Sequence, residues 1–186
     1  LERADSWATD AHKWLNVPYD SGIAIVRHAE DHRAAMTSTA AYLVQTRGGE
    51  RDAVDWVPEF SRRARGIPVY ATLRSLGRAG VAALVDGLCA RARQFAALLA
   101  AEPGVAILND VVLNQVLVRF GDDDALTRRV VQGIQDEGTC WASGTTWHGL
   151  AALRISVSNW ATSEADVAIS AAAMLRVYRA LRDPAG

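Results

Sequence analysis

A long helical pattern in the middle of the chain limits the folds that these 186 residues can adopt. Between residues 69 and 101, apolar side chains recur at three- and four-residue spacing, and Glu102-Pro103-Gly104 then ends the pattern. The positions on this stripe are Val69, Leu73, Leu76, Leu84, Leu88, Phe95 and Leu99. We therefore expect a helical crossover that joins two different parts of the chain.

The part before the crossover predicts two strands around a polar loop. Residues Ala4 to Thr9 predict a short strand, and Gly22 to Arg27 predict a buried strand because Ile23-Ala24-Ile25-Val26 is apolar and rich in β-branched residues. Apolar periodicity is lost from Gln45 to Asp55, which predicts a mobile surface loop.

The part after the crossover predicts a compact unit of strands and helices. Its expected strands are Val105 to Leu108, Gln115 to Phe120 and Leu153 to Ser158, with a loop from Thr139 to Gly149 before the third strand. A helix from Ala125 to Glu137 is expected to begin after Asp124 as N-cap and to end at Gly138.

The last helix is expected to run to about Leu181 with Thr162 as its N-cap. In that register Ala165 takes the third helical position, so the sequence predicts no capping box. Together these patterns predict an α/β protein with a domain over residues 1–68 and a second over residues 69–186.

Composition excludes several classes of partner. Half of the residues are apolar, 22% are charged and the net charge is −1, so no nucleic-acid-binding surface is indicated. No apolar run approaches the roughly 18 residues that a membrane span needs. Cys89 and Cys140 lie far apart without metal-ligand spacing, which predicts reduced thiols, no metal site and a cytoplasmic location. Because the chain lacks an initial Met and a targeting signal, we expect a piece of a longer protein.

Lys13 is the single lysine among the 20 basic residues, and it lies between a His and a Trp before the apolar strand. Burial of a lysine lowers its pKa and frees the amine to condense with an aldehyde. Arginine cannot replace it, because the guanidinium stays protonated. We therefore expect Lys13 to lie in a dry pocket.

The segment Asp-Ala-His-Lys-Trp-Leu at residues 10–15, preceded by Ala-Asp-Ser, resembles the cofactor-lysine motif of the group II pyridoxal-phosphate-dependent decarboxylases. That family includes the aromatic-L-amino-acid and glutamate decarboxylases. The resemblance covers essentially the whole chain but only the C-terminal part of such an enzyme. It implies the α/β fold type I of pyridoxal-phosphate-dependent transferases, similar to aspartate aminotransferase. Residues 1–68 would end the large cofactor domain, including the catalytic loop, and residues 69–186 would form the crossover helix and the small α+β domain.

The resemblance implies roles for three residues of the motif. Lys13 would form a Schiff base with the aldehyde of pyridoxal 5'-phosphate, and His12 would contribute to the phosphate site. Asp10 would lie beside the phosphate, although a carboxylate repels that group, so a role in shaping the loop is equally open.

Two further residues carry implied roles outside the motif. Tyr42 matches a catalytic-loop tyrosine that protonates Cα after CO₂ leaves, whereas relatives with Phe there form aldehydes by oxidation. Arg154 matches an arginine near the substrate carboxylate. The alternatives are ordinary packing for Tyr42 and a structural ion pair for Arg154. Arg62, Arg63 and Arg65 are expected to anchor the crossover and the dimer.

The resemblance thus implies decarboxylation of an L-amino acid to the amine and CO₂ by a homodimer with shared active sites, without nucleic acid or membrane partners. An oxidative deaminase, an aldehyde synthase or another lyase of the same fold is one alternative. A catalytically incomplete C-terminal fragment is the other. The residues that bind the pyridine nitrogen and select the substrate would lie upstream.

Overall fold

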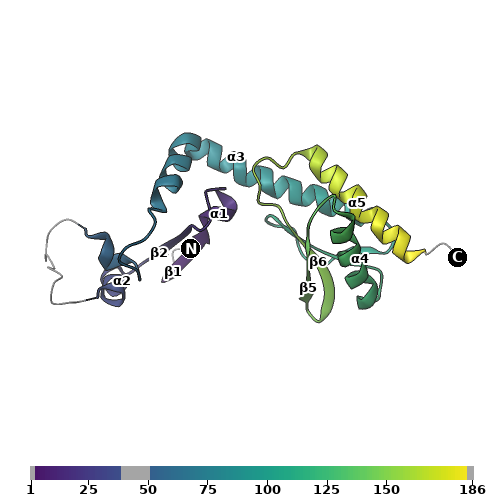
Figure 1. The fold of residues 1–186 in the computed structure, drawn as a ribbon, viewed down its shortest axis with the longest axis horizontal. Coiled ribbons are helices and arrows are strands. Elements are labelled where there is room, and N and C mark those ends of the chain that lie inside the picture. The colour runs from purple at the N-terminus through teal and green to yellow at the C-terminus, as the bar shows by residue number, and fades with distance from the viewer. Residues whose placement is uncertain (1–2, 39–50, 184–186) are drawn as a thin grey trace. The chain divides into compact units, whose positions relative to one another are not determined.

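A computed structural model describes residues 3–38 and 51–183, and the chain divides into two units, 1–75 and 76–186 (Figure 1). The helix α3 (Gly66–Ala100) contains the boundary, which therefore falls later than the one expected after residue 68. The helical pattern is interrupted at Gly77, whose φ of 62° lies in the left-handed region that glycine tolerates. The assignment of residues 1–68 and 69–186 to a large and a small domain stays a prediction.

Unit 1 begins with a two-stranded antiparallel sheet. Strands β1 (Ser6–Asp10) and β2 (Gly22–Val26) pair from Ser6 opposite Val26 to Asp10 opposite Gly22, and the one-turn helix α1 (Ala11–Trp14) lies in their connection. Both strands lie where the sequence predicts them.

The prediction that β2 is buried is wrong for this unit. Ile25 is 43% exposed, as is Trp7 of β1 at 40%. The apolar sequence correctly predicts a strand, but burial requires covering elements on the sheet faces, and a two-stranded ribbon supplies none by itself.

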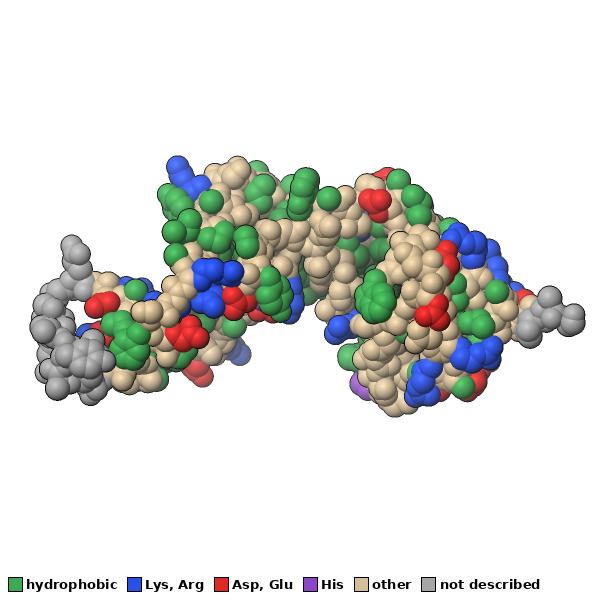
Figure 2. All heavy atoms as spheres, viewed as in Figure 1, with side chains coloured by type: hydrophobic (Ala, Val, Ile, Leu, Met, Phe, Trp, Pro, Cys, Tyr) green, Lys and Arg blue, Asp and Glu red, His purple; other side chains and the backbone are tan. Residues whose placement is uncertain are grey.

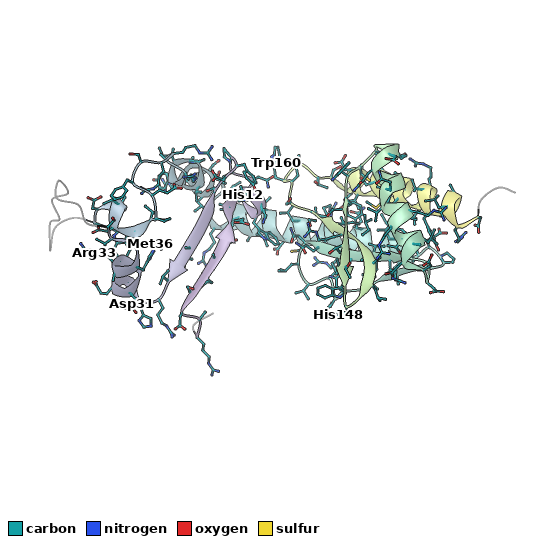
Figure 3. The ribbon with its side chains drawn as sticks, turned by 60° about the horizontal axis from the view of Figure 1, so that its bottom comes forward. His12, Asp31, Arg33, Met36, His148 and Trp160 are labelled. Atoms are coloured by element: carbon teal, nitrogen blue, oxygen red, sulfur yellow. The ribbon has the colours of Figure 1, made fainter. Side chains whose placement is uncertain are left out.

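The rest of unit 1 contains helices that the sequence did not indicate. These are α2 (Ala29–Met36) and the 3₁₀ helix η1 (Ala53–Trp56), which overlaps the end of the segment predicted as a loop. Arg33 of α2 donates from Nη2 to Oδ2 of the buried Asp55 at 2.8 Å, and His32 meets the Trp56 ring edge-on at 5.4 Å between ring centroids. Figure 3 labels Arg33 on α2. Tyr42 lies outside the described residues.

The first turns of α3 expose apolar side chains rather than burying them. Ile67, Tyr70 and Leu73 are 68%, 67% and 42% exposed, and Figure 2 shows apolar side chains at the surface along α3. The later stripe residues Leu88, Phe95 and Leu99 are buried, as the helical spacing predicts.

Unit 2 is built on a four-stranded antiparallel sheet with the strand order β3-β4-β6-β5. Its strands are β3 (Val105–Ile107), β4 (Gln115–Phe120), β5 (Ser143–Trp147) and β6 (Leu150–Ser156). The helices α4 (Asp124–Glu137) and α5 (Glu164–Arg182) contact each other and complete the unit (Figure 1).

Strand β5 lies inside the segment predicted as a loop. Ser143-Gly144-Thr145-Thr146-Trp147 has no apolar alternation, because β5 is an edge strand with a single neighbour, β6. The turn to β6 consists of His148 and Gly149, with φ of 47° and 83°. Two residues with positive φ form the type of turn that favours a tight hairpin.

The caps of α4 and α5 each lie one residue from the predicted position. Asp123, not Asp124, is the N-cap of α4 and accepts from the backbone N–H of Ala125 and Leu126. Ser163 is the N-cap of α5 and forms a capping box with Asp166. The prediction of no capping box was therefore wrong, because the shift by one residue places Asp166 at the third helical position.

The core of unit 2 lies between the helices and one face of the sheet. Val116, Val118 and Phe120 share that face of β4 and are fully buried, and Phe120 packs against Tyr178 of α5 at 5.3 Å between ring centroids. The fully buried Thr127 of α4 tightens this packing, since its hydroxyl donates to the Phe120 carbonyl at 2.9 Å and accepts the Phe120 N–H at 3.1 Å.

Substituting Thr127→Val is expected to lower the free energy of unfolding by about 1–3 kcal/mol, because it leaves the buried N–H and carbonyl of Phe120 without this partner. Thr127→Ser keeps the hydroxyl and serves as the matched control. Urea denaturation of both variants in the full-length protein checks the prediction. Equal stability of the Val variant and the parent would contradict it.

Candidate active site

Lys13 lies in the short connection of the β1–β2 hairpin, where local contacts fix the backbone. Ala11 is buried, and its carbonyl accepts the N–H of Leu15 at 3.1 Å, closing the single turn of α1. The Asn16 side chain donates to the Lys13 carbonyl at 2.8 Å, and its φ of 52° turns the chain out of the helix. The hairpin thus holds Lys13 at the end of two paired strands.

The amine of Lys13 is not desolvated by the described residues. Its side chain is 60% exposed, and Nζ donates to Oδ2 of Asp10 at 2.5 Å. The expected dry pocket is therefore absent from this part of the structure, because the two-stranded sheet supplies no apolar walls around the turn. The hydrogen bond from Lys13 holds the pKa of Asp10 below its usual range.

His12 is held in one orientation by the loop that returns to β2. The backbone N–H of the buried Ser21 donates to Nδ1 at 2.9 Å, and the Tyr19 ring lies 4.2 Å away between centroids. The Ser21 carbonyl oxygen lies at the same 2.9 Å from Nδ1, so Nδ1 accepts from the Ser21 N–H in one imidazole tautomer and donates to the Ser21 carbonyl in the other. Figure 3 labels His12 at this end of the hairpin. Both contacts with Ser21 are made by Nδ1, so Ser21 fixes the position of the imidazole ring.

The arginine cluster before α3 anchors the same loop. Arg63 donates to the Tyr19 carbonyl at 2.6 Å, and Arg65 binds both carboxylate oxygens of Asp20 at 3.0 and 3.2 Å. The hydrogen bond from Arg65 holds the pKa of Asp20 below its usual range. The sequence predicts an anchoring role for this cluster but does not indicate that Asp20 is its partner.

A hollow of about 850 Å³ lies beside this anchor, lined by Asp20, Gly22 and residues 57–66. Lys13 is not among its lining residues. The arginines that border it already bind Asp20 and backbone carbonyls, so this hollow offers no unpaired cation to an anionic ligand.

Arg154 belongs to unit 2, where it lies on β6 opposite Leu117 and Ser143. It is exposed, whereas the neighbouring Leu153 and Ile155 are buried on the other face of the sheet. Within residues 3–38 and 51–183, no carboxylate lies within ion-pair distance of its guanidinium. The structural ion pair considered as an alternative is therefore not present in that part of the chain.

The structure thus brings together Lys13, His12 and Asp10 in unit 1. Arg154 is in the other unit, and Tyr42 is outside the described residues. Sequence reasoning missed Ser21, the hydrogen-bonding partner of His12. The pairing of the two predicted strands could have indicated this contact, because Asp10 opposite Gly22 brings residue 21 close to the start of α1.

The described part of the chain offers neither a metal site nor a membrane-spanning helix. It contains no group of three or more His, Cys, Asp or Glu side chains that could bind a metal ion. None of its helices combines the length and the apolar character that crossing a bilayer requires.

Comparison with known proteins places these observations in a family. The pattern of the pyridoxal-dependent decarboxylase conserved domain matches residues 1–120. The chain is 26% identical over 168 residues to a histidine decarboxylase of Drosophila melanogaster, which covers 90% of this chain and 20% of that protein. The chain therefore spans about a fifth of the length of this relative.

Two solved structures share the fold at 21% sequence identity. The structure of Oryza sativa TDC with PLP and tryptamine has a TM-score of 0.88, covering 96% of this chain and 39% of that one. The structure of Rhodiola rosea 4-hydroxyphenylacetaldehyde synthase has a TM-score of 0.81, covering 95% and 37%. These likenesses confirm the predicted α/β fold type I.

The family pattern includes the Lys13 segment, both strands of the hairpin and the arginine anchor, and it ends with β4. This chain belongs to the pyridoxal-dependent decarboxylase family.

Proposed function

We propose that the protein containing this chain decarboxylates an L-amino acid to the amine and CO₂ with pyridoxal 5'-phosphate as cofactor. The observation that carries the proposal is the pair His12 and Lys13, held at the end of the hairpin in a member of this family. Lys13 is the one primary amine among the side chains of this chain.

The side chains of this turn fit the cofactor in two respects. Lys13 would hold the cofactor aldehyde through its amine, and Nε2 of His12 would donate to the phosphate when that nitrogen carries a proton. When bound, the cofactor supplies the electron sink for the bond that breaks at Cα. Asp10 fits the phosphate poorly, because an ionised carboxylate only accepts hydrogen bonds and repels an anion.

Arg154 and Tyr42 are assigned to the substrate. A guanidinium without a carboxylate partner in the described structure is suited to orienting a substrate carboxylate. The Tyr42 phenol would deliver a proton to Cα after CO₂ departs. We further propose that two copies form a homodimer with shared active sites and that the protein works in the cytoplasm.

The full-length protein tests this proposal. The protein is incubated with pyridoxal phosphate and one amino acid at a time: an aromatic amino acid, histidine or glutamate. The amounts of amine and CO₂ that form are then measured. We expect equal amounts of the two products from at least one amino acid. Absence of both products with every amino acid would contradict the proposal.

The same assay addresses the alternative that this stretch is catalytically incomplete alone. The 60% exposure of the Lys13 side chain supports that alternative for the isolated chain. Turnover by residues 1–186 alone would rule it out.

An aldehyde-forming reaction is the second candidate, because the fold does not separate the two chemistries. The chain is as similar in sequence to the Rhodiola rosea 4-hydroxyphenylacetaldehyde synthase as to the Oryza sativa protein, at 21% identity. The presence of a phenol at Tyr42 favours simple decarboxylation, since a phenyl ring has no proton to donate.

Substituting Tyr42→Phe is expected to reduce amine formation by about 100-fold or more, because the general acid is lost. Oxygen uptake, aldehyde, ammonia and peroxide should rise in its place. Tyr70→Phe is the matched control, since Tyr70 lies 67% exposed on α3. Aldehyde and peroxide as the main products of the unsubstituted protein would instead favour the second candidate.

A further inference from the structure

Asp10 occupies a position where an aspartate ordinarily caps a helix. It precedes α1 with extended backbone angles, φ −91° and ψ 104°. An N-cap carboxylate normally accepts from the backbone N–H of the second or third helical residue. The Asp10 side chain makes no such bond and instead accepts from the side chain of Lys13, the third residue of α1.

The surroundings of Asp10 leave Lys13 as its main charged partner. The charged or titratable groups that act on its carboxylate are Lys13 and His12, with Lys13 the stronger. The β2 strand contributes no charge at this point, because the facing residue is Gly22. The other acidic residue of the loop, Asp20, binds Arg63 and Arg65 rather than Lys13.

We propose that Asp10 is a positioning residue for Lys13: its carboxylate holds the lysine ammonium in the cofactor-free protein, and cofactor attachment has to break this contact. The inference rests on the proposed function, because it concerns the amine that would carry the cofactor. It assigns Asp10 to the lysine rather than to the phosphate or to shaping of the loop.

The chemistry of attachment explains why this contact matters. The lysine nitrogen and the aldehyde carbon form a C=N bond while the aldehyde C=O bond breaks. The oxygen leaves as water with two of the three ammonium protons, and the third proton stays on nitrogen. The nitrogen needs a free lone pair to attack, whereas the nitrogen bound to Asp10 is a charged hydrogen-bond donor. Asp10 therefore orients the Lys13 amine and also slows its attack on the cofactor aldehyde.

Acylation of the cofactor-free full-length protein by acetic anhydride tests the proposal without relying on enzymatic activity. The rate at the Lys13 peptide is followed by mass spectrometry at neutral pH. Asp10→Asn should raise this rate about two- to fivefold, the range that the strength of exposed ion pairs implies. Asp10→Glu keeps the charge and should restore slow acylation.

Asp20→Asn is the matched control, because Asp20 is a half-exposed carboxylate of the same loop with arginine partners. An unchanged rate in Asp10→Asn, or an equal rise in Asp20→Asn, would overturn the inference. Borohydride reduction of the unsubstituted protein with pyridoxal phosphate tests the proposed function independently of the proposed role of Asp10. Absence of cofactor on the Lys13 peptide would contradict the proposed function and leave the acylation result unaffected.

Discussion

Substituting Lys13→Ala is expected to abolish covalent attachment of pyridoxal phosphate to the full-length protein. The side chains of residues 1–186 contain no other primary amine, so no neighbour in this chain can replace it. The measurement is borohydride reduction in the presence of the cofactor, followed by mass spectrometry of the peptide that includes residue 13. Visible absorbance of the bound cofactor and amino-acid decarboxylation should be lost together.

Lys13→Arg is the matched control for charge and folding. Arginine can keep the ion pair with Asp10, but its guanidinium stays protonated and does not condense with an aldehyde. We therefore expect the Arg variant to lack the cofactor as completely as the Ala variant. Full attachment or turnover in either variant would place the reactive amine elsewhere in the protein and refute the role of Lys13.

The second large effect concerns stability and is expected from Phe120→Ala in the core of unit 2. Phe120 is fully buried on β4, its ring contacts the Tyr178 ring in a tilted arrangement, and its backbone is hydrogen-bonded to Thr127. Truncation removes apolar contact and leaves a cavity, which costs about 3–5 kcal/mol for a buried aromatic residue. Domains of ordinary stability have only about 5–15 kcal/mol in total.

Phe120→Leu keeps a large apolar side chain and is the matched control, with a smaller expected loss. Denaturant unfolding of the full-length protein, followed by hydrogen exchange in unit 2, measures both variants. A loss below about 1 kcal/mol in Phe120→Ala would show that the site can collapse or is less tightly packed than the described core.

Elements with strong local signals could be predicted from sequence. The β-branched run of β2 and the alternating β4 were found within one residue, and Gly138 ends α4 with a φ of 82°. In these cases a few consecutive residues determine the backbone conformation. The Lys13 segment belongs to the same class, because its residue types and order carry the family resemblance.

Elements whose signal depends on neighbours could not be predicted. The edge strand β5 was missed because β6 supplies its hydrogen bonds while its own sequence lacks alternation. Helix α2 was missed because half of its residues are polar, its apolar residues do not form a helical stripe, and none of them is buried.

The sequence by itself determined that Lys13 is the one side-chain primary amine of this chain and where most of the strands and helices lie, because residue chemistry and apolar spacing act over short distances. Only the tertiary structure decided that Lys13 is exposed and paired with Asp10, that Ser21 orients His12, and that Asp20 receives Arg63 and Arg65. Exposure depends on which segments cover a side chain, and Arg63 and Arg65 come from a distant segment, so local sequence does not encode these features. Asp10 and Lys13 are close in sequence, but the sequence does not decide between this ion pair and a helix-capping bond from Asp10.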